Sequence, residues 1–148
     1  MKKKICLFVL LGICAVLYAA TGDESVVLTS SVERRNQEPN IKPVWELVST
    51  WTYDTDDAGA ETISIPINGT LQKIILTIPV TTTTGTTTQL LIKDNGDNTI
   101  FDSGEQAEND TYTFNVSEPL SGTIDIVIEP SAAAGTSGSA PVVTMRGI

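Results

Sequence analysis

The sequence lacks most of the side chains that enzymes use for chemistry. Its 148 residues contain no His, and its two cysteines, Cys6 and Cys14, both lie in an apolar stretch near the N-terminus. Beyond that stretch, composition alone excludes His-based triads, Cys–His pairs and His-based metal centres. No Gly-rich phosphate loop stands between a strand and a helix pattern. We therefore expect a protein that is not an enzyme, and one stabilised by packing and strand pairing rather than by disulfides.

The first 22 residues have the pattern of an export signal. Lys2, Lys3 and Lys4 form a basic start, residues 5–17 are almost wholly apolar, and residues 19–22 supply small side chains for cleavage. The apolar run is shorter than the about 20 residues that cross a bilayer. We predict a signal peptide over 1–22, with a retained membrane anchor as the alternative. The protein would then be extracellular, on a virion or on a cell surface.

Basic residues are scarce. The chain has nine Lys and Arg against 18 Asp and Glu, a net charge of −9. Loss of the first three lysines leaves six basic residues and a net charge of −12. Such a surface repels nucleic acid and anionic lipid, so neither is expected as a partner. Contact with a membrane is expected only through an uncleaved N-terminal segment.

Residues 23–43 are polar and contain residues that interrupt regular structure, so they are expected to be a linker or arm. Within them, residues 25–32 include Val26, Val27 and Leu28 and could form one short strand or a helix turn.

From residue 44 to residue 148 the hydrophobic period is two. Alternate residues of a strand point to the same face, so each apolar set predicts one strand with its side chains in a common core. Gly, Asn and Asp clusters separate the sets. This predicts an all-β domain over 44–148, an antiparallel β-sandwich of jelly-roll type with about eight short strands. A last strand is expected over 142–145. The other sets are Trp45, Leu47, Trp51 and Tyr53; Ile63, Ile65 and Ile67; Ile74, Leu76, Ile78 and Val80; Leu90 and Ile92; Tyr112, Phe114 and Val116; and Ile124, Ile126 and Ile128.

Two local patterns suggest turns. Asn68-Gly69 between two apolar-alternating runs predicts a β-hairpin. Thr81 to Thr88 places seven Thr around Gly85, which is typical of an exposed hairpin or loop tip. A flat Thr-rich binding face is the alternative for this run, but the run does not repeat at a fixed period.

One acidic segment has the oxygen ligands that Ca²⁺ prefers. Asp94, Asn95 and Asp97, together with Asp102, could converge around a turn. The spacing is not that of an EF-hand loop, and an Asx-Gly turn between strands has the same residues without any metal. We expect a turn here and no cofactor, with Ca²⁺ as the alternative.

Trp45, Trp51 and Tyr53 are the clustered large aromatics of the chain. If they are exposed on one face, they could stack on sugar rings. If they are buried, they are core residues, which is the commoner fate of alternating aromatics.

The order of turns and strands over residues 61–148 resembles small β-rich structural proteins of bacteriophage virions. This resemblance implies a structural module that assembles on a virion. The predicted export segment departs from the pattern, because most virion proteins assemble in the cytoplasm. A membrane-containing virion or a cell surface would be compatible with both. The resemblance is carried by Leu71-Gln72-Lys73-Ile74, Leu90-Leu91-Ile92-Lys93-Asp94, Ile100-Phe101-Asp102-Ser103-Gly104, Pro119-Leu120-Ser121-Gly122-Thr123-Ile124 and Val142-Val143-Thr144.

Two functional hypotheses follow. The first is a structural protein of a virion or cell surface that self-associates or joins a larger protein assembly through its β module. The second is a secreted carbohydrate- or ligand-binding sandwich, with or without stabilisation by Ca²⁺. Fold alone does not choose between them.

Overall fold

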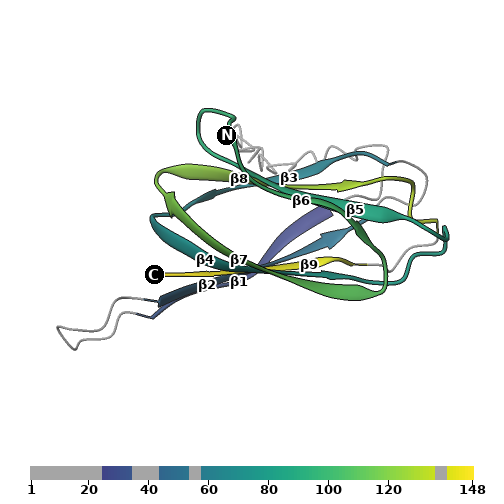
Figure 1. The fold of residues 1–148 in the computed structure, drawn as a ribbon, viewed down its shortest axis with the longest axis horizontal. Coiled ribbons are helices and arrows are strands. Elements are labelled where there is room, and N and C mark those ends of the chain that lie inside the picture. The colour runs from purple at the N-terminus through teal and green to yellow at the C-terminus, as the bar shows by residue number, and fades with distance from the viewer. Residues whose placement is uncertain (1–24, 35–43, 54–57, 136–139) are drawn as a thin grey trace, which may run out of the picture.

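The computed structural model describes residues 25–34, 44–53, 58–135 and 140–148, with the backbone alone for 25–34. The predicted signal peptide and most of the predicted arm lie outside these residues. No helix within the described ranges has the length and apolarity needed to cross a membrane. The described residues form nine strands in two facing layers (Figure 1): β1 (Ser25–Arg34), β2 (Val44–Thr52), β3 (Glu61–Pro66), β4 (Gly69–Ile78), β5 (Thr87–Lys93), β6 (Thr99–Ala107), β7 (Asp110–Leu120), β8 (Thr123–Pro130) and β9 (Val142–Gly147).

The strand order is that of a jelly roll. One sheet, sheet A, has the order β1-β2-β9-β4-β7, and the other, sheet B, has the order β3-β8-β5-β6. Four antiparallel pairs are nested along the chain: β5 with β6, β4 with β7, β3 with β8, and β2 with β9. Strands β2 to β9 therefore form one long two-stranded ribbon, which folds back at residues 94–98 and is rolled into two sheets. The predicted antiparallel sandwich is confirmed.

Asn68-Gly69 does not form the predicted hairpin. It connects β3 of sheet B to β4 of sheet A, so the two flanking strands do not pair with each other. The segment is held instead by the β7–β8 turn, where the Gly122 N–H donates to Asn68 Oδ1 at 3.2 Å and the Ile67 N–H donates to the Gly122 carbonyl at 2.8 Å. Gly69 has a φ of +143°, which L side chains rarely adopt. The chain does change direction at these residues, but the predicted pairing of the flanking strands is wrong.

Strand β1 lies inside the segment that the sequence suggested as a polar arm. Nine of its ten residues pair antiparallel with β2 and make β1 one edge of sheet A. Of the two conformations considered for this segment, the structure has the strand. Pairing with β2 gives the β1 backbone hydrogen-bond partners along one side.

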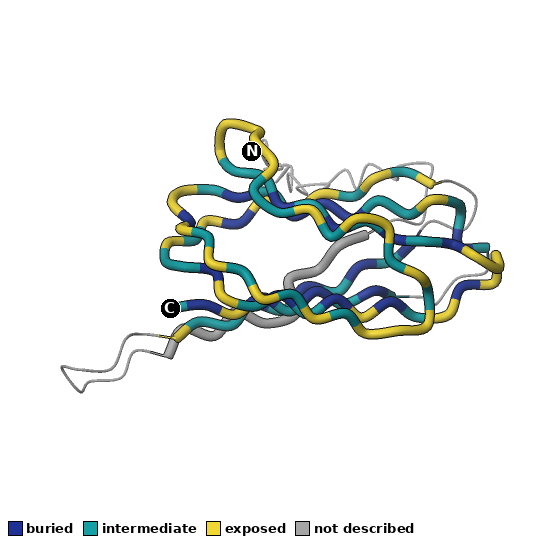
Figure 2. Tube along the Cα trace, viewed as in Figure 1, coloured by how far each residue is buried: buried dark blue, intermediate teal, exposed yellow. Residues whose placement is uncertain are grey.

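The core lies between the two sheets and follows the predicted alternation. Along the inner strands, buried residues alternate with half-buried or exposed ones (Figure 2). Fully burying one such aliphatic side chain stabilises the fold by about 1.5–3 kcal/mol relative to leaving it exposed. Core residues that are 2% exposed or less include Leu47, Trp51, Leu71, Ile74, Leu76, Ile78, Leu90, Ile92, Ile124, Ile126, Ile128, Val143 and Met145.

Several connections meet at one end of the sandwich. The Thr82 N–H donates to the Ala134 carbonyl at 3.1 Å, and the Ser131 N–H donates to the Thr87 carbonyl at 2.8 Å. These bonds join the β4–β5 loop to the β8–β9 connection. The opposite end holds the C-terminal residue, where Ile148 and Thr70 exchange two backbone hydrogen bonds of 3.0 and 2.7 Å.

Candidate interaction surface

Two of the three clustered aromatics are core residues and do not form a sugar-stacking platform. The Trp51 side chain is 1% exposed, and its Nε1–H donates to Ser49 Oγ at 3.0 Å. Tyr53 is 5% exposed, its hydroxyl hydrogen bonds to the hydroxyl of buried Thr88, and burial raises the pKa of its phenol. Both belong to the alternating set that points inward from β2, so the pleat that groups them also buries them.

Trp45 starts the same set but lies half-buried at the other end of the sandwich. Its indole lies against Gly147, where a Cβ would come within 2.2 Å of Cζ2, and against Gly69, where a Cβ would come within 2.8 Å of Nε1. The two glycines therefore leave the space that this ring fills. Its Nε1 is buried and has no hydrogen-bond partner among the described residues.

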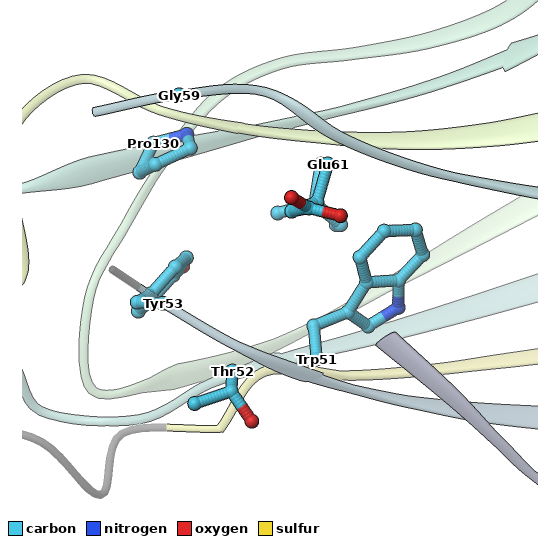
Figure 3. Close-up of a pocket in the computed structure, with 7 residues that line it drawn as sticks. Trp51, Thr52, Tyr53, Gly59, Glu61 and Pro130 are labelled. Carbon is cyan, nitrogen blue, oxygen red and sulfur yellow. The ribbon is translucent and has the colours of Figure 1, made fainter. Parts of the chain in front are cut away.

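A small pocket lies beside Trp51 and Tyr53. Thr52, Gly59, Glu61, Ile128 and Pro130 complete its lining (Figure 3). Its cavity volume is about 10 Å³. That is room for about one water molecule and not for a sugar ring.

The acidic segment at residues 94–98 is the β5–β6 turn. Asp94 Oδ1 accepts hydrogen bonds from the backbone N–H groups of Gly96 (2.8 Å) and Asn98 (2.9 Å), and the Asn98 amide donates to both carboxylate oxygens at 3.0 Å. The bonds from Asn98 and Gly96 hold the pKa of Asp94 below its usual value. The carboxylate therefore organises the turn, as the turn hypothesis predicted.

Asp97 and Asp102, two other residues of the alternative Ca²⁺ site, contact other side chains. Asp97 forms an ion pair with Lys93 at 3.2 Å, and exposed Asn95 lies at the tip of the turn. Asp102 lies further along, on β6, and accepts from the Gln89 amide at 2.7 Å and the Gly104 N–H at 2.7 Å. Within the described ranges, no three His, Cys, Asp or Glu side chains gather closely enough to hold a metal ion.

The Thr-rich run is not a hairpin but a connection between the two sheets, and its tip at residues 82–85 is exposed, as the loop-tip prediction required. Thr81, Thr86 and Thr88 are 6% exposed or less, while residues 82–85 are exposed. Glu108, which sequence reasoning did not single out, holds this loop. Its Oε2 accepts from the Thr81 N–H and hydroxyl, both at 2.6 Å, and its Oε1 accepts from the Gly85 N–H at 3.1 Å. The bonds from Thr81 and Gly85 lower the pKa of Glu108.

The outer surface of sheet A has an uncharged patch in the middle of an acidic protein. Strands β2, β9, β4 and β7 each contribute two outward-pointing Thr, Val or Ile residues, and their registers align them in two rows across the sheet. One row is Thr50, Val142, Thr77 and Thr111; the other is Val48, Thr144, Ile75 and Thr113. We call these eight residues the uncharged face.

The side chains of the uncharged face are accessible. Thr77, Thr111 and Thr113 are exposed and the other five are half-buried. The Thr77 and Thr111 hydroxyls hydrogen bond to each other across β4 and β7 at 3.2 Å, which fixes both side chains on the surface. The adjoining row along the strands is charged: Arg146 pairs with Glu46 at 2.6 Å, and Lys73 lies in register with Arg146 on β4. The face is thus an uncharged area with a charged margin.

The outer surface of sheet B is different because acidic groups run across it. Asp125 accepts from the Ser64 hydroxyl at 2.6 Å, and Glu105 accepts from the Thr87 hydroxyl at 3.3 Å. Asp102 lies in register with Leu91 of β5, and Glu129 with Gln89. The two outer surfaces of this sandwich therefore differ in charge, and that asymmetry is not visible in any single segment of the sequence.

No protein-family model matches the chain, and no curated protein matches its sequence. Among solved structures, it is similar to the Yersinia pseudotuberculosis-derived mitogen, with a TM-score of 0.39 and 10% identity over 68% of this chain and 85% of the mitogen. It is also similar to a chain of infectious bursal disease virus, Gt strain (TM-score 0.34, 13% identity, 78% of this chain and 36% of the viral chain). A third is the enzymatically active domain of tailspike protein 4 of bacteriophage CBA120 (TM-score 0.31, 13% identity, 86% of this chain and 19% of the tailspike). Viral and phage proteins are thus among its structural neighbours, at similarities too low to assign a function.

Proposed function

We propose that this protein is a non-enzymatic structural component of a virion or cell surface, whose copies assemble through the uncharged face. The observation that carries the proposal is the two-row array of eight Thr, Val and Ile side chains across four strands. Copies of a chain with 18 acidic and nine basic residues repel one another. The centres of protein interfaces are depleted in charged residues, so an uncharged, flat area is where two such copies can approach.

The hydrogen bonds of three carboxylates support a non-catalytic role. Asp94 organises a turn, Asp102 accepts hydrogen bonds from a neighbouring strand and from its own strand, and Glu108 holds the Thr-rich loop. Each is already engaged in local structure. Burial of Trp51 and Tyr53 counts against the carbohydrate-binding alternative, which needed both rings on a surface.

A pair of matched lysine substitutions tests the proposal. Val48 on β2 and Leu91 on β5 are both half-buried aliphatic residues on the outer side of their sheets, but only Val48 belongs to the uncharged face. Val48→Lys and Leu91→Lys change the net charge equally. An interfacial ammonium that loses its water on association is costly, so Val48→Lys should weaken self-association at least tenfold, while Leu91→Lys should leave it unchanged.

Light scattering of each purified protein over a range of concentrations measures the association. Circular dichroism melts establish that both variants fold. If Val48→Lys associates as strongly as the unmodified protein, the uncharged face is not the contact and the proposal fails.

A further inference from the structure

The described part of the sandwich has four open sheet edges, and three of them are irregular or short. Edge strands expose unpaired N–H and C=O groups that can pair with another chain, and proteins protect them with bulges, Pro or short length. The β1 edge has a register shift between Leu28 and Ser30. Strand β3 has six residues and ends at Pro66. The β6 edge has two register shifts and contains Gly104 with a φ of +62°.

The fourth edge, β7, is longer than β3 and is regular over its first six residues. From Asp110 to Asn115 it pairs residue by residue with Ile78 to Lys73 of β4, and its register shift and Pro119 come only afterwards. The run from residue 111 to residue 117 (Thr-Tyr-Thr-Phe-Asn-Val-Ser) contains no charge and is rich in strand-forming residues. Its nearest acidic residues, Asp110 and Glu118, flank the run at each end. The uncharged part of this edge that pairs regularly with β4 is therefore five residues long, from Thr111 to Asn115.

The side chains that β7 directs towards the core are also incompletely covered. Tyr112, Phe114 and Val116 are half-buried, whereas Ile74 and Leu76 on the neighbouring strand β4 are 0% exposed. Phe114 makes an edge-to-face contact with Phe101 of β6, with ring centroids 5.2 Å apart. These three side chains are therefore covered by β4 on one side and remain partly exposed to solvent along the free edge of β7.

We propose that the free edge of β7 pairs antiparallel with β7 of a second copy, which joins the two A sheets into one continuous sheet. This deepens the proposed function, because it names the partner and a second contact, but it uses the edge of sheet A and not its face. The pairing sets uncharged run against uncharged run, and each copy covers the half-buried row of the other. A contact of a strand with its own copy about a two-fold axis is self-complementary and closes as a dimer.

The position of β7 also connects this edge to the uncharged face. Thr111 and Thr113 belong to the face and lie on its outermost strand, so pairing at β7 makes one double-width surface from two copies. The acidic residues Asp110 and Glu118 approach those of the second copy at both ends of the paired run. Salt screens this repulsion, so dimerisation should strengthen as ionic strength rises.

Disulfide trapping tests the edge directly. In a background with Cys6→Ser and Cys14→Ser, single cysteines are placed at Thr111, Thr113 or Asn115, which share the outward side of β7. The control positions are Thr62 on β3 and Thr99 on β6, exposed residues on two other edges. Disulfides need Cα atoms about 4.4–6.8 Å apart, which is the separation of residues directly opposite in an antiparallel pair.

The proposal predicts a pattern and not merely dimers. About a two-fold axis, each residue faces one partner position. The variants and pairwise mixtures whose cysteines face each other about a single axis should therefore cross-link at least tenfold more than the other combinations. A two-fold axis at Thr113, for example, predicts that T113C links to itself and that T111C links to N115C. The T62C and T99C variants should remain monomeric under mild oxidation. Equal yields at all positions, or no cross-link in any β7 combination, would overturn the proposal.

The face and edge contacts fail separately in these experiments. Val48 is on β2, three strands away from β7 in sheet A. If β7 cross-links form while Val48→Lys leaves light scattering unchanged, the edge contact is right and face-mediated assembly is wrong. If Val48→Lys weakens association and no β7 combination cross-links, the reverse holds.

Discussion

Replacing Trp51 with Ala separates a core aromatic from a ligand-binding one. The side chain is 1% exposed, so nearly all of its apolar surface is buried in the core and is lost on replacement by Ala. Truncations of this kind cost about 3–5 kcal/mol, because the cavity is not fully refilled. The change also removes the donor to the hydroxyl of Ser49, which is 0% exposed. A buried group left without its partner costs about 1–3 kcal/mol, so we expect a loss near the upper end, about 5 kcal/mol in the free energy of unfolding.

Urea unfolding followed by far-UV circular dichroism measures this loss, with an unchanged slope showing that the same surface is exposed on unfolding. A domain of this size should melt about 15 °C lower or more. Val44→Ala is the control, because Val44 is 48% exposed and its truncation should change the free energy of unfolding by less than about 0.5 kcal/mol. A loss below about 1 kcal/mol for Trp51→Ala would refute the packing argument and return the ring to the list of binding residues.

Four further predictions concern other parts of the fold. Because the pKa of Glu108 is lowered in the folded protein, its carboxylate stabilises the fold above the unfolded pKa of about 4.3, and this stabilisation is lost as pH falls through the folded pKa. The difference in melting temperature between the unmodified protein and Glu108→Gln should therefore close below pH 4. A constant difference from pH 7 to pH 2.5 would contradict this. Adding Ca²⁺ should move the melting temperature by a few degrees at most, and a rise of about 10 °C that Asp94→Ala abolishes would establish a metal site. Gly147→Ala should destabilise the fold by about 1–3 kcal/mol or more in urea unfolding, because its Cβ would lie 2.3 Å from the Thr70 carbonyl oxygen and 2.2 Å from the Trp45 ring; an unchanged midpoint would show that the sheet yields there. Intact-mass measurement of the exported protein should show cleavage near residues 20–22, and a mass retaining Met1 would indicate an anchor.

The fold class was predictable because alternation is a local property. Ile74, Leu76 and Ile78 share a parity along β4, and the structure buries all three together. Asx and Gly clusters likewise marked the turns, and Asp94 behaves as its position before Asn95-Gly96 indicated. These patterns depend on a few neighbouring residues and need no knowledge of the partner strand.

The strand pairing and the candidate surface could not be predicted in this way. Asn68-Gly69 has hairpin chemistry, but β3 and β4 find their partners in different sheets, because pairing in a jelly roll is decided by residues far apart in the chain. The uncharged face draws pairs of residues from four strands, and Thr144 and Ile75 become neighbours only once β9 is known to lie beside β4. The one local signal was that the outward residues of these strands are Thr, Val and Ile and not Asp, Glu or Lys. Glu108 gave no signal, because its role depends on the loop from Thr81 to Gly85 that folds over it.

Sedimentation velocity of the purified exported protein over a wide concentration range, with a search for the protein in purified particle and envelope fractions, tests the central claim most directly. The account predicts that sedimentation coefficients rise with concentration, that salt strengthens the association, and that the protein copurifies with one of these fractions. A monomer at every concentration and salt level, absent from both fractions, would contradict assembly as the function of this protein.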